Sequence, residues 1–403
     1  MRRFGATIAA ARPRVVAALA ARLRDLDQAE DAFAEAAAAA LVAWPNQAPR
    51  DAAAWLWRAS LRRAIDARRR AAVRSRAIHD PPPPAPTPED ILLAADEPIP
   101  DERLRLIFVC CHPALSPEAR VALTLKVVCG LSTERLARAF FTAEPAMLQR
   151  ITRAKRKIAA AGIPFEIPGR DAWPERLDAI LATLEVAYAQ AYEDAALAAP
   201  DVAPFAAEVL RLSGLLAELM PDEPEVLGLA ATVRFAEARR PARLDSSGAM
   251  IPPDRQDPAL WRVDLIDEAT RLLDVAARAG RSGPRQILAA IHGVHCARRA
   301  TGHTDWSVIV ALYDVLNLVT PHPAVAVNRA VAHGEAFGAQ AGLALLQAVE
   351  GMDDWLPYHA ARGHLSARAG HRADAVEAWT AALALNPPPA EQRYLEQRLR
   401  DLT

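Results

Sequence analysis

The residues whose spacing is most telling lie in the segment AEPAMLQRITRAKRKI, between positions 143 and 158. Met147, Ile151, Ala154 and Ile158 recur there at helical intervals, so one face of a predicted helix is apolar. Side chains on the other faces can reach base edges early in the helix, and cations along its sides and end, Lys155 included, can meet phosphates. The candidate DNA-binding residues of this helix are Leu148, Gln149, Arg150, Thr152, Arg153, Arg156 and Lys157.

Two shorter predicted helices come before this one and would hold it in place. Ser116 can cap the first with Pro117 in its first turn, and Gly130 can end it. Ser132 can cap the second helix, and Thr142 can cap the basic third helix. This order predicts a helix-turn-helix whose third helix enters the major groove of DNA. An ordinary three-helix bundle, with the cations at the negative end of a helix dipole, is the alternative.

A second basic helix is predicted upstream, from 52 to 76, with Asp51 as its cap. Its apolar positions, Trp55, Ala59, Leu61 and Ile65, can pack inward. Tryptophans beside arginines are typical of a single-stranded nucleic-acid surface, because indoles stack on bases and guanidinium groups follow phosphates. For a helix taken by itself, core tryptophans and solvated arginines are the favoured interpretation. The basic face comprises Arg58, Arg62, Arg63, Arg68, Arg69 and Arg70.

Composition favours an all-α protein of more than one domain. The chain has 403 residues, and 52% of them are hydrophobic with few aromatics and many alanines. Its net charge of -1 conceals an asymmetry: residues 1–80 carry 15 arginines against 8 acidic residues, whereas the part after Gly169 is acidic. The basic half should therefore seek a polyanion.

The same composition predicts a soluble, cytoplasmic protein with no membrane association. The four cysteines, Cys110, Cys111, Cys129 and Cys296, form no CxxC spacing. The longest apolar run covers only nine residues, and Arg12 to Arg14 interrupt an N-terminus that begins like a signal peptide. The proline-rich stretch PPPPAPTPED, residues 81–90, predicts an extended linker between the two basic modules.

The order of these modules along the chain, and the residues within them, closely resemble bacterial sigma factors of the extracytoplasmic-function (ECF) type. The segments that carry the resemblance are LDQAEDAFAEA, AAWLWRASLRRAIDARRR and, most specifically, LIFVCCHPALSPEARVALTLK through RAKRKIAAAGIPF. More narrowly, the chain is similar to the subgroup with a long tetratricopeptide-like C-terminal domain. The resemblance implies a region 2 domain at 1–80, a linker at 81–100, a region 4 helix-turn-helix domain at 101–168 and a C-terminal helical domain at 171–403.

What the resemblance implies for function is transcription initiation. Core RNA polymerase would bind region 2 through Glu30, Asp31 and Glu35. Promoter DNA would be melted and read by Trp55, Arg62, Asp66, Arg68 and Arg69, and the helix-turn-helix would read the minus-thirty-five element. The C-terminal domain would regulate, with a regulatory protein as a further expected partner. The alternative is a helical-repeat interaction protein whose basic half binds nucleic acid nonspecifically.

The C-terminal half also carries its own repeat signal. Gly363, Gly370, Ala375, Trp379, Ala382 and Pro387 match the spacing of a tetratricopeptide repeat, and Ala341, Leu345 and Ala348 form a weaker copy 34 residues earlier. One repeat cannot bury its own apolar face, so further helix pairs should stack upstream into a short solenoid.

The sequence predicts no catalytic residue, cofactor or metal site. His292, His295 and Cys296, and also Cys110, Cys111 and His112, lack the second ligand pair of a closed metal site, so core packing is favoured. Motifs for phosphate binding or hydrolysis are missing from the sequence, so no enzyme is predicted.

Overall fold

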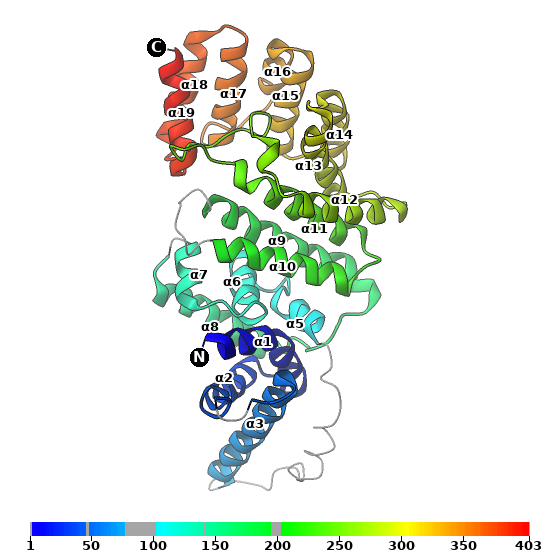
Figure 1. The fold of residues 1–403 in the computed structure, drawn as a ribbon, viewed down its shortest axis with the longest axis vertical. Coiled ribbons are helices and arrows are strands. Elements are labelled where there is room, and N and C mark those ends of the chain that lie inside the picture. Colours follow the sequence, from blue (N-terminus) through cyan, green and yellow to red (C-terminus); the bar gives the residue numbers. More distant parts are fainter. Residues whose placement is uncertain (1, 46–47, 77–101, 141, 195–202, 403) are drawn as a thin grey trace. The chain divides into compact units, whose positions relative to one another are not determined.

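The computed structural model describes residues 2–45, 48–76, 102–140, 142–194 and 203–402 (Figure 1). Within these ranges the regular elements are helices, and an isolated bridge pairs Leu244 with Met250. This confirms the predicted all-α class. The chain divides into two compact units, Met1–Ala187 and Tyr188–Thr403. The predicted linker lies outside the described residues.

The first unit begins with three helices that pack on one another: α1 (Arg2–Leu23), α2 (Leu26–Ala43) and α3 (Ala52–Arg76). Asp25 caps α2 by accepting a hydrogen bond from the Gln28 amide at 3.0 Å. Asp51 accepts one from the Ala54 amide at 3.0 Å, which confirms the predicted cap of α3. Arg24 and Asp25 separate α1 from α2, and Pro13 lies inside α1.

The buried stripe of α3 differs from the predicted one. Leu61 is buried as expected, but Trp55, Ala59 and Ile65 are only half-buried. The fully buried positions form a neighbouring stripe, because α3 packs on both α1 and α2. They are Leu56, Trp57, Ser60, Leu61 and Ala64.

The remaining helices of this unit include the predicted helix-turn-helix at residues 116–158. They are α5 (Arg103–Cys110), α6 (Pro117–Val127), α7 (Thr133–Ala139) and α8 (Glu144–Ala160), followed by the start of α9 (Trp173–Asp194). Ser116 and Ser132 cap α6 and α7 as expected, accepting from the amides of Ala119 and Arg135. Gly130 follows α6 with a φ of 77°, in the left-handed region that glycine adopts without strain.

The predicted cap of α8 is wrong. Ala143 occupies the cap position and makes no side-chain hydrogen bond, and the Thr142 amide instead donates to the Ala137 carbonyl at 2.9 Å. Pro145, in the first turn, removes one amide that would otherwise need a partner, so α8 starts without a polar cap.

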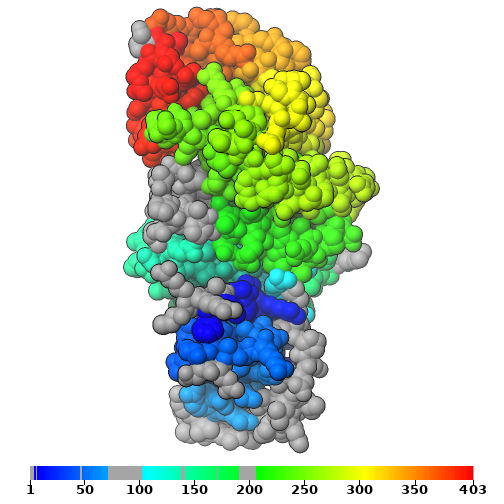
Figure 2. Space-filling model, viewed as in Figure 1, coloured from blue at the N-terminus to red at the C-terminus, as the bar shows by residue number. Residues whose placement is uncertain are grey.

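The second unit is a succession of helices, each packed against its neighbours in sequence, and Figure 2 shows its surface coloured in that same order. Successive cores fill the spaces between them, as expected of a solenoid. The helices are α10 (Ala203–Leu219), α11 (Pro224–Arg239), α12 (Val263–Arg278), α13 (Pro284–Thr301), α14 (Trp306–Val319), α15 (Pro323–Phe337), α16 (Ala339–Leu346), α17 (Leu356–Arg368), α18 (Arg372–Ala384) and α19 (Pro389–Leu402).

The helix pair α17 and α18 accounts for the tetratricopeptide-like spacing seen in the sequence. A Cβ atom at position 363 would overlap the Trp379 indole, so α17 and α18 approach closely only because residue 363 is glycine. Gly370, with a φ of 80°, follows the end of α17.

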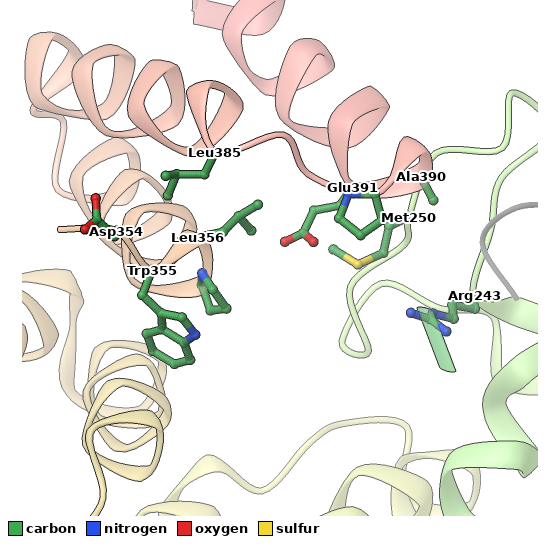
Figure 3. A pocket seen from close by; sticks show the side chains of 10 residues that line it. Arg243, Met250, Asp354, Trp355, Leu356, Leu385, Ala390 and Glu391 are labelled. Carbon is green, nitrogen blue, oxygen red and sulfur yellow. The ribbon is translucent and has the colours of Figure 1, made fainter. Parts of the chain in front are cut away.

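The segment between α11 and α12 reaches across the unit to α19. The Met250 amide donates to the Ala390 carbonyl at 3.0 Å, and Arg393 donates to the Gly248 carbonyl at 3.3 Å. A cavity of about 370 Å³ lies beside this contact. Figure 3 shows Trp355 and Leu356 on one side of it and Met250 on the other.

Candidate nucleic-acid interface

Helix α8 buries one face and exposes the opposite one. Its buried residues are Met147, Ile151, Ala154 and Ile158, which confirms the predicted stripe. Helices α6 and α7 cover that stripe. Leu148, Gln149, Arg153, Arg156 and Lys157 are exposed, whereas Arg150 and Thr152 are half-buried. The helix therefore presents polar and basic side chains on a firmly held support.

Some side chains on the exposed faces of α8 already have partners. The Thr152 hydroxyl donates to the Leu148 carbonyl at 2.9 Å, and the Arg150 guanidinium lies 6.0 Å from the centre of the Phe140 ring. The side chains of Gln149, Arg153, Arg156 and Lys157 make no hydrogen bond or ion pair within the described residues. These four are the polar residues of α8 best placed to meet a ligand from solution.

The candidate residues of α3 fall into two groups. Arg62, Asp66 and Arg69 are exposed along the helix. Arg68 is exposed too, but it donates to the Gln28 side chain at 3.0 Å and to the Leu23 carbonyl at 2.7 Å, so it ties α3 to the junction of α1 and α2.

Trp55 is half-buried against another indole. Its ring centre lies 5.6 Å from that of Trp44, in an edge-to-face arrangement. Trp57 is 5% exposed and belongs to the core. Of the two tryptophans, only Trp55 offers surface on which a base could stack.

The three acidic residues predicted to bind polymerase do not share one surface. Asp31 and Glu35 are exposed and lie one turn apart on α2. Glu35 is 3.6 Å from Arg63 of α3. Glu30 points away from them, toward α8, and its side chain is only 14% exposed.

Glu30 is the centre of an ion-pair cluster that joins α1, α2 and α8. One carboxylate oxygen accepts from Arg12 at 2.5 Å and the other from Lys155 at 2.7 Å. Lys155 also bonds Asp27 at 2.6 Å. Burial alone would lower the pKa of Lys155, but Glu30 and the hydrogen bonds to both carboxylates raise it above its ordinary value.

Arg12 extends this cluster to the end of α6. Its second guanidinium nitrogen donates to the Val127 carbonyl at 2.9 Å, and its side chain lies against Gly130. The basic module that contains α1 to α3 is thus joined to the helix-turn-helix by Arg12 and Lys155. Sequence reasoning placed Lys155 among the phosphate-binding cations and missed Arg12 and Asp27, because no local pattern shows which distant helix a side chain will meet.

The described part of the chain contains no group of three or more metal-ligating side chains. Burial raises the pKa of the Cys110 and Cys111 thiols. The Cys111 sulfur lies 3.2 Å from the Thr124 hydroxyl. None of the helices in the described ranges is long and apolar enough to cross a membrane.

Comparison with known proteins gives two family matches. Residues 105–158, which span α5 to α8 almost entirely, match the model of sigma-70, region 4. Residues 176–277 match a family of unknown function (DUF6596). No solved structure matches.

One relative matches along nearly its whole length. An uncharacterized protein of Rhizobium meliloti (strain 1021) is 38% identical over 411 residues, which cover 98% of this chain and 95% of the relative. The chain belongs to the same family as that protein, and its helix-turn-helix segment is similar to sigma-70, region 4.

Proposed function

We propose that this protein is a sigma factor of the ECF type, which binds core RNA polymerase in the cytoplasm and directs promoter recognition and opening. The observation that carries the proposal is α8, an amphipathic helix in a region 4 domain with Gln149, Arg153 and Arg156 exposed and unpaired within the described residues. Such a helix can place amide and guanidinium groups at base edges and phosphates. No catalytic step is assigned to the protein.

The experiment that tests this function is run-off transcription with purified core polymerase on a genomic library, followed by binding to a responsive promoter. Arg153→Ala and Arg156→Ala should weaken binding to all DNA sequences. The slope of log binding constant against log salt concentration should become shallower by about 0.9 for each phosphate that is no longer neutralised. Gln149→Ala should instead change the preferred minus-thirty-five sequence. Arg271→Ala, at an exposed position of α12, is the matched control. Equal effects of all three α8 variants on every sequence would contradict the assignment of α8 as the reading helix.

For polymerase, we assign the primary contact to Asp31 and Glu35, which are exposed on α2. Glu30 would take part once its bonds to Arg12 and Lys155 are exchanged for bonds to polymerase. Asp31→Arg should therefore reduce co-elution with core polymerase, and Asp267→Arg, at an exposed position of α12, serves as the charge-matched control. If Asp31→Arg binds core polymerase as well as the parent protein, the assignment is wrong.

For promoter opening, we assign Trp55 and the exposed residues Arg62, Asp66 and Arg69 of α3, with Arg68 as a support of that helix. Permanganate footprinting on a responsive promoter should show lost melting with Asp66→Ala while closed-complex binding persists. Retained melting would leave α3 with a packing role alone.

We propose that the C-terminal helices form a tetratricopeptide-like domain that regulates transcription. The domain would act through a protein partner or through the basic modules. The truncation that tests this role should end after Ala187 rather than at residue 168. Trp173 and Arg176 support α5, since Arg176 donates to the Phe108 carbonyl at 2.8 Å, and they belong to the first unit. A folded truncation with unchanged transcription and unchanged response to inducing conditions would rule the role out.

A further inference from the structure

The second unit contains a buried cation, Arg239, whose surroundings differ from those of its neighbours. Arg239 ends α11 and is 6% exposed. Its Nε donates to the Phe235 carbonyl at 3.3 Å, and one terminal nitrogen donates to Nδ1 of His292 at 2.7 Å. Within the described residues, neither partner of this guanidinium is a carboxylate.

Two arginines of the same unit pair with carboxylates, whereas the less buried Arg298 donates to the carbonyl groups of Pro253 and Gln256. Arg234, five residues earlier on α11, pairs with Glu268 at 2.9 Å. Arg329 pairs with Asp314 at 2.5 Å. The nearby Glu237 is engaged by Arg240 and by the Tyr188 hydroxyl, and residues two apart on a helix face different directions. The carbonyl groups at the end of α11 carry only a fraction of a negative charge, so the charge of Arg239 is incompletely balanced.

The groups around Arg239 are neutral hydrogen-bonding side chains. His292 accepts from Arg239 at Nδ1, so its proton resides on Nε2, which can donate. His295 stands one turn further along α13 against Trp306, and its Nδ1 is buried without a hydrogen bond. Tyr313 of α14 packs beside the same helix. No hydrogen bond to His292 Nε2 or to the Tyr313 hydroxyl occurs within the described residues.

Electrostatic effects agree with this grouping. Burial, and then the charge of Arg239, lowers the pKa of His292 and brings that of His295 to about 3. Burial raises the pKa of Tyr313 to about 12, and Arg239 opposes that rise. Both histidines are therefore neutral near pH 7. His292 and Tyr313 are surrounded by protein on most sides but keep accessible surface.

We propose that Arg239, His292 and Tyr313, with His295 beside them, bind the carboxylate group of a small organic acid. Arg239 supplies one positive charge in contact with His292, and the other groups add neutral donors, which matches a carboxylate monoanion. The charge of Arg298 also acts on His295, but Arg298 makes no contact with these groups among the described hydrogen bonds. A guanidinium fork can hold two carboxylate oxygens at once. Trp306 and Val294 are partly buried and pack against the core between α13 and α14, and their remaining exposed surface suits contact with a short hydrocarbon remainder. The inference rests on the second unit alone and is independent of the proposed transcriptional role.

The test is a titration of the full-length protein with propionate, followed through the histidine ring signals in an NMR spectrum at pH 7.5. Sodium chloride keeps the ionic strength constant, and propionamide and phosphate are the comparison ligands. Propionate should shift the His292 and His295 signals saturably and leave those of the exposed His322 in place. Arg239→Gln should weaken binding at least tenfold, and Tyr313→Phe about threefold. Arg240→Gln, which disrupts an ordinary ion pair, should retain affinity.

A short peptide with a free or an amidated C-terminus distinguishes the two sources of a carboxylate. Tighter binding of the free peptide than of propionate, and loss of binding on amidation, would identify a peptide end as the natural ligand. The proposal is overturned if propionate causes no saturable shift, if propionamide or phosphate binds equally well, or if Tyr313→Phe and Arg239→Gln both bind propionate as the parent does.

Discussion

Lys155 in the first unit and Arg239 in the second are both cations that are largely shielded from solvent, and they differ in what surrounds them. Lys155 meets two carboxylates, at 2.6 and 2.7 Å. Arg239 meets a carbonyl group and a neutral imidazole. A buried charge is costly unless it is paired and hydrogen-bonded. The charge of Lys155 is therefore balanced by carboxylates of the same chain. The charge of Arg239 is not, so a bound anion could balance it.

The largest expected effect comes from removing the shared carboxylate of the complete cluster. Glu30→Ala should destabilise the first unit by about 2 to 3 kcal/mol, because Arg12 and Lys155 would both lose a partner in a mostly buried setting. Hydrogen exchange of peptides from α1 and α2 measures the change. A cost below about 0.5 kcal/mol would mean that the cluster is loose in solution.

The second expected effect is a loss of stability of the second unit in acid. Because the pKa of His295 falls to about 3 in the folded state, the unfolded chain binds its proton more readily. His295 alone should therefore lower stability as the pH falls from about 6.5 toward 3, by at most about 2 kcal/mol at pH 5, and His292, whose pKa is also lowered, adds to this loss. Hydrogen exchange of α13 peptides at pH 7 and pH 5 follows this change. His295→Gln should reduce the pH dependence, and an unchanged dependence would contradict the assignment.

A matched pair of substitutions compares what each cation contributes to the free energy of unfolding. Lys155→Met should cost about 1 kcal/mol, because Glu30 and Asp27 lose a partner. Without added ligand, Arg239→Met should be neutral or stabilising, since methionine removes a charge that no carboxylate balances. Urea unfolding of the full chain, followed by hydrogen exchange in each unit, tests both. Equal costs would mean that the two sites are alike.

The smallest effect should appear at an exposed ion pair on the same helix as Glu30. Glu35→Ala removes the partner of Arg63, but the Glu35 side chain is 59% exposed and the two groups are 3.6 Å apart. The expected change is within about 0.5 kcal/mol, and it should shrink further in 1 M salt. A cost close to that of Glu30→Ala would show that burial does not decide the difference.

The sequence predicted those features that depend on neighbours within one or two helical turns. The buried stripe of α8, the caps at Ser116 and Ser132, and the close pair Gly363 and Trp379 all follow from local spacing. The cap at Thr142 was wrong because a proline can start a helix without a polar cap. The partners of Lys155 could not be predicted, since they lie more than 120 residues away along the chain.

The adjacent cysteines at the end of α5 have a practical consequence. Cys110 and Cys111 are fully buried, and burial raises the pKa of both thiols, so the reactive thiolate form is scarce while the unit stays folded. A maleimide should therefore modify them only in molecules whose helix-turn-helix core has opened. The half-buried Cys129 should react more readily under the same conditions and would serve as a reference within each molecule. The ratio of the labelling rate of Cys110 and Cys111 to that of Cys129 would measure how often the DNA-reading domain opens. Mass spectrometry can follow both rates without an added fluorophore.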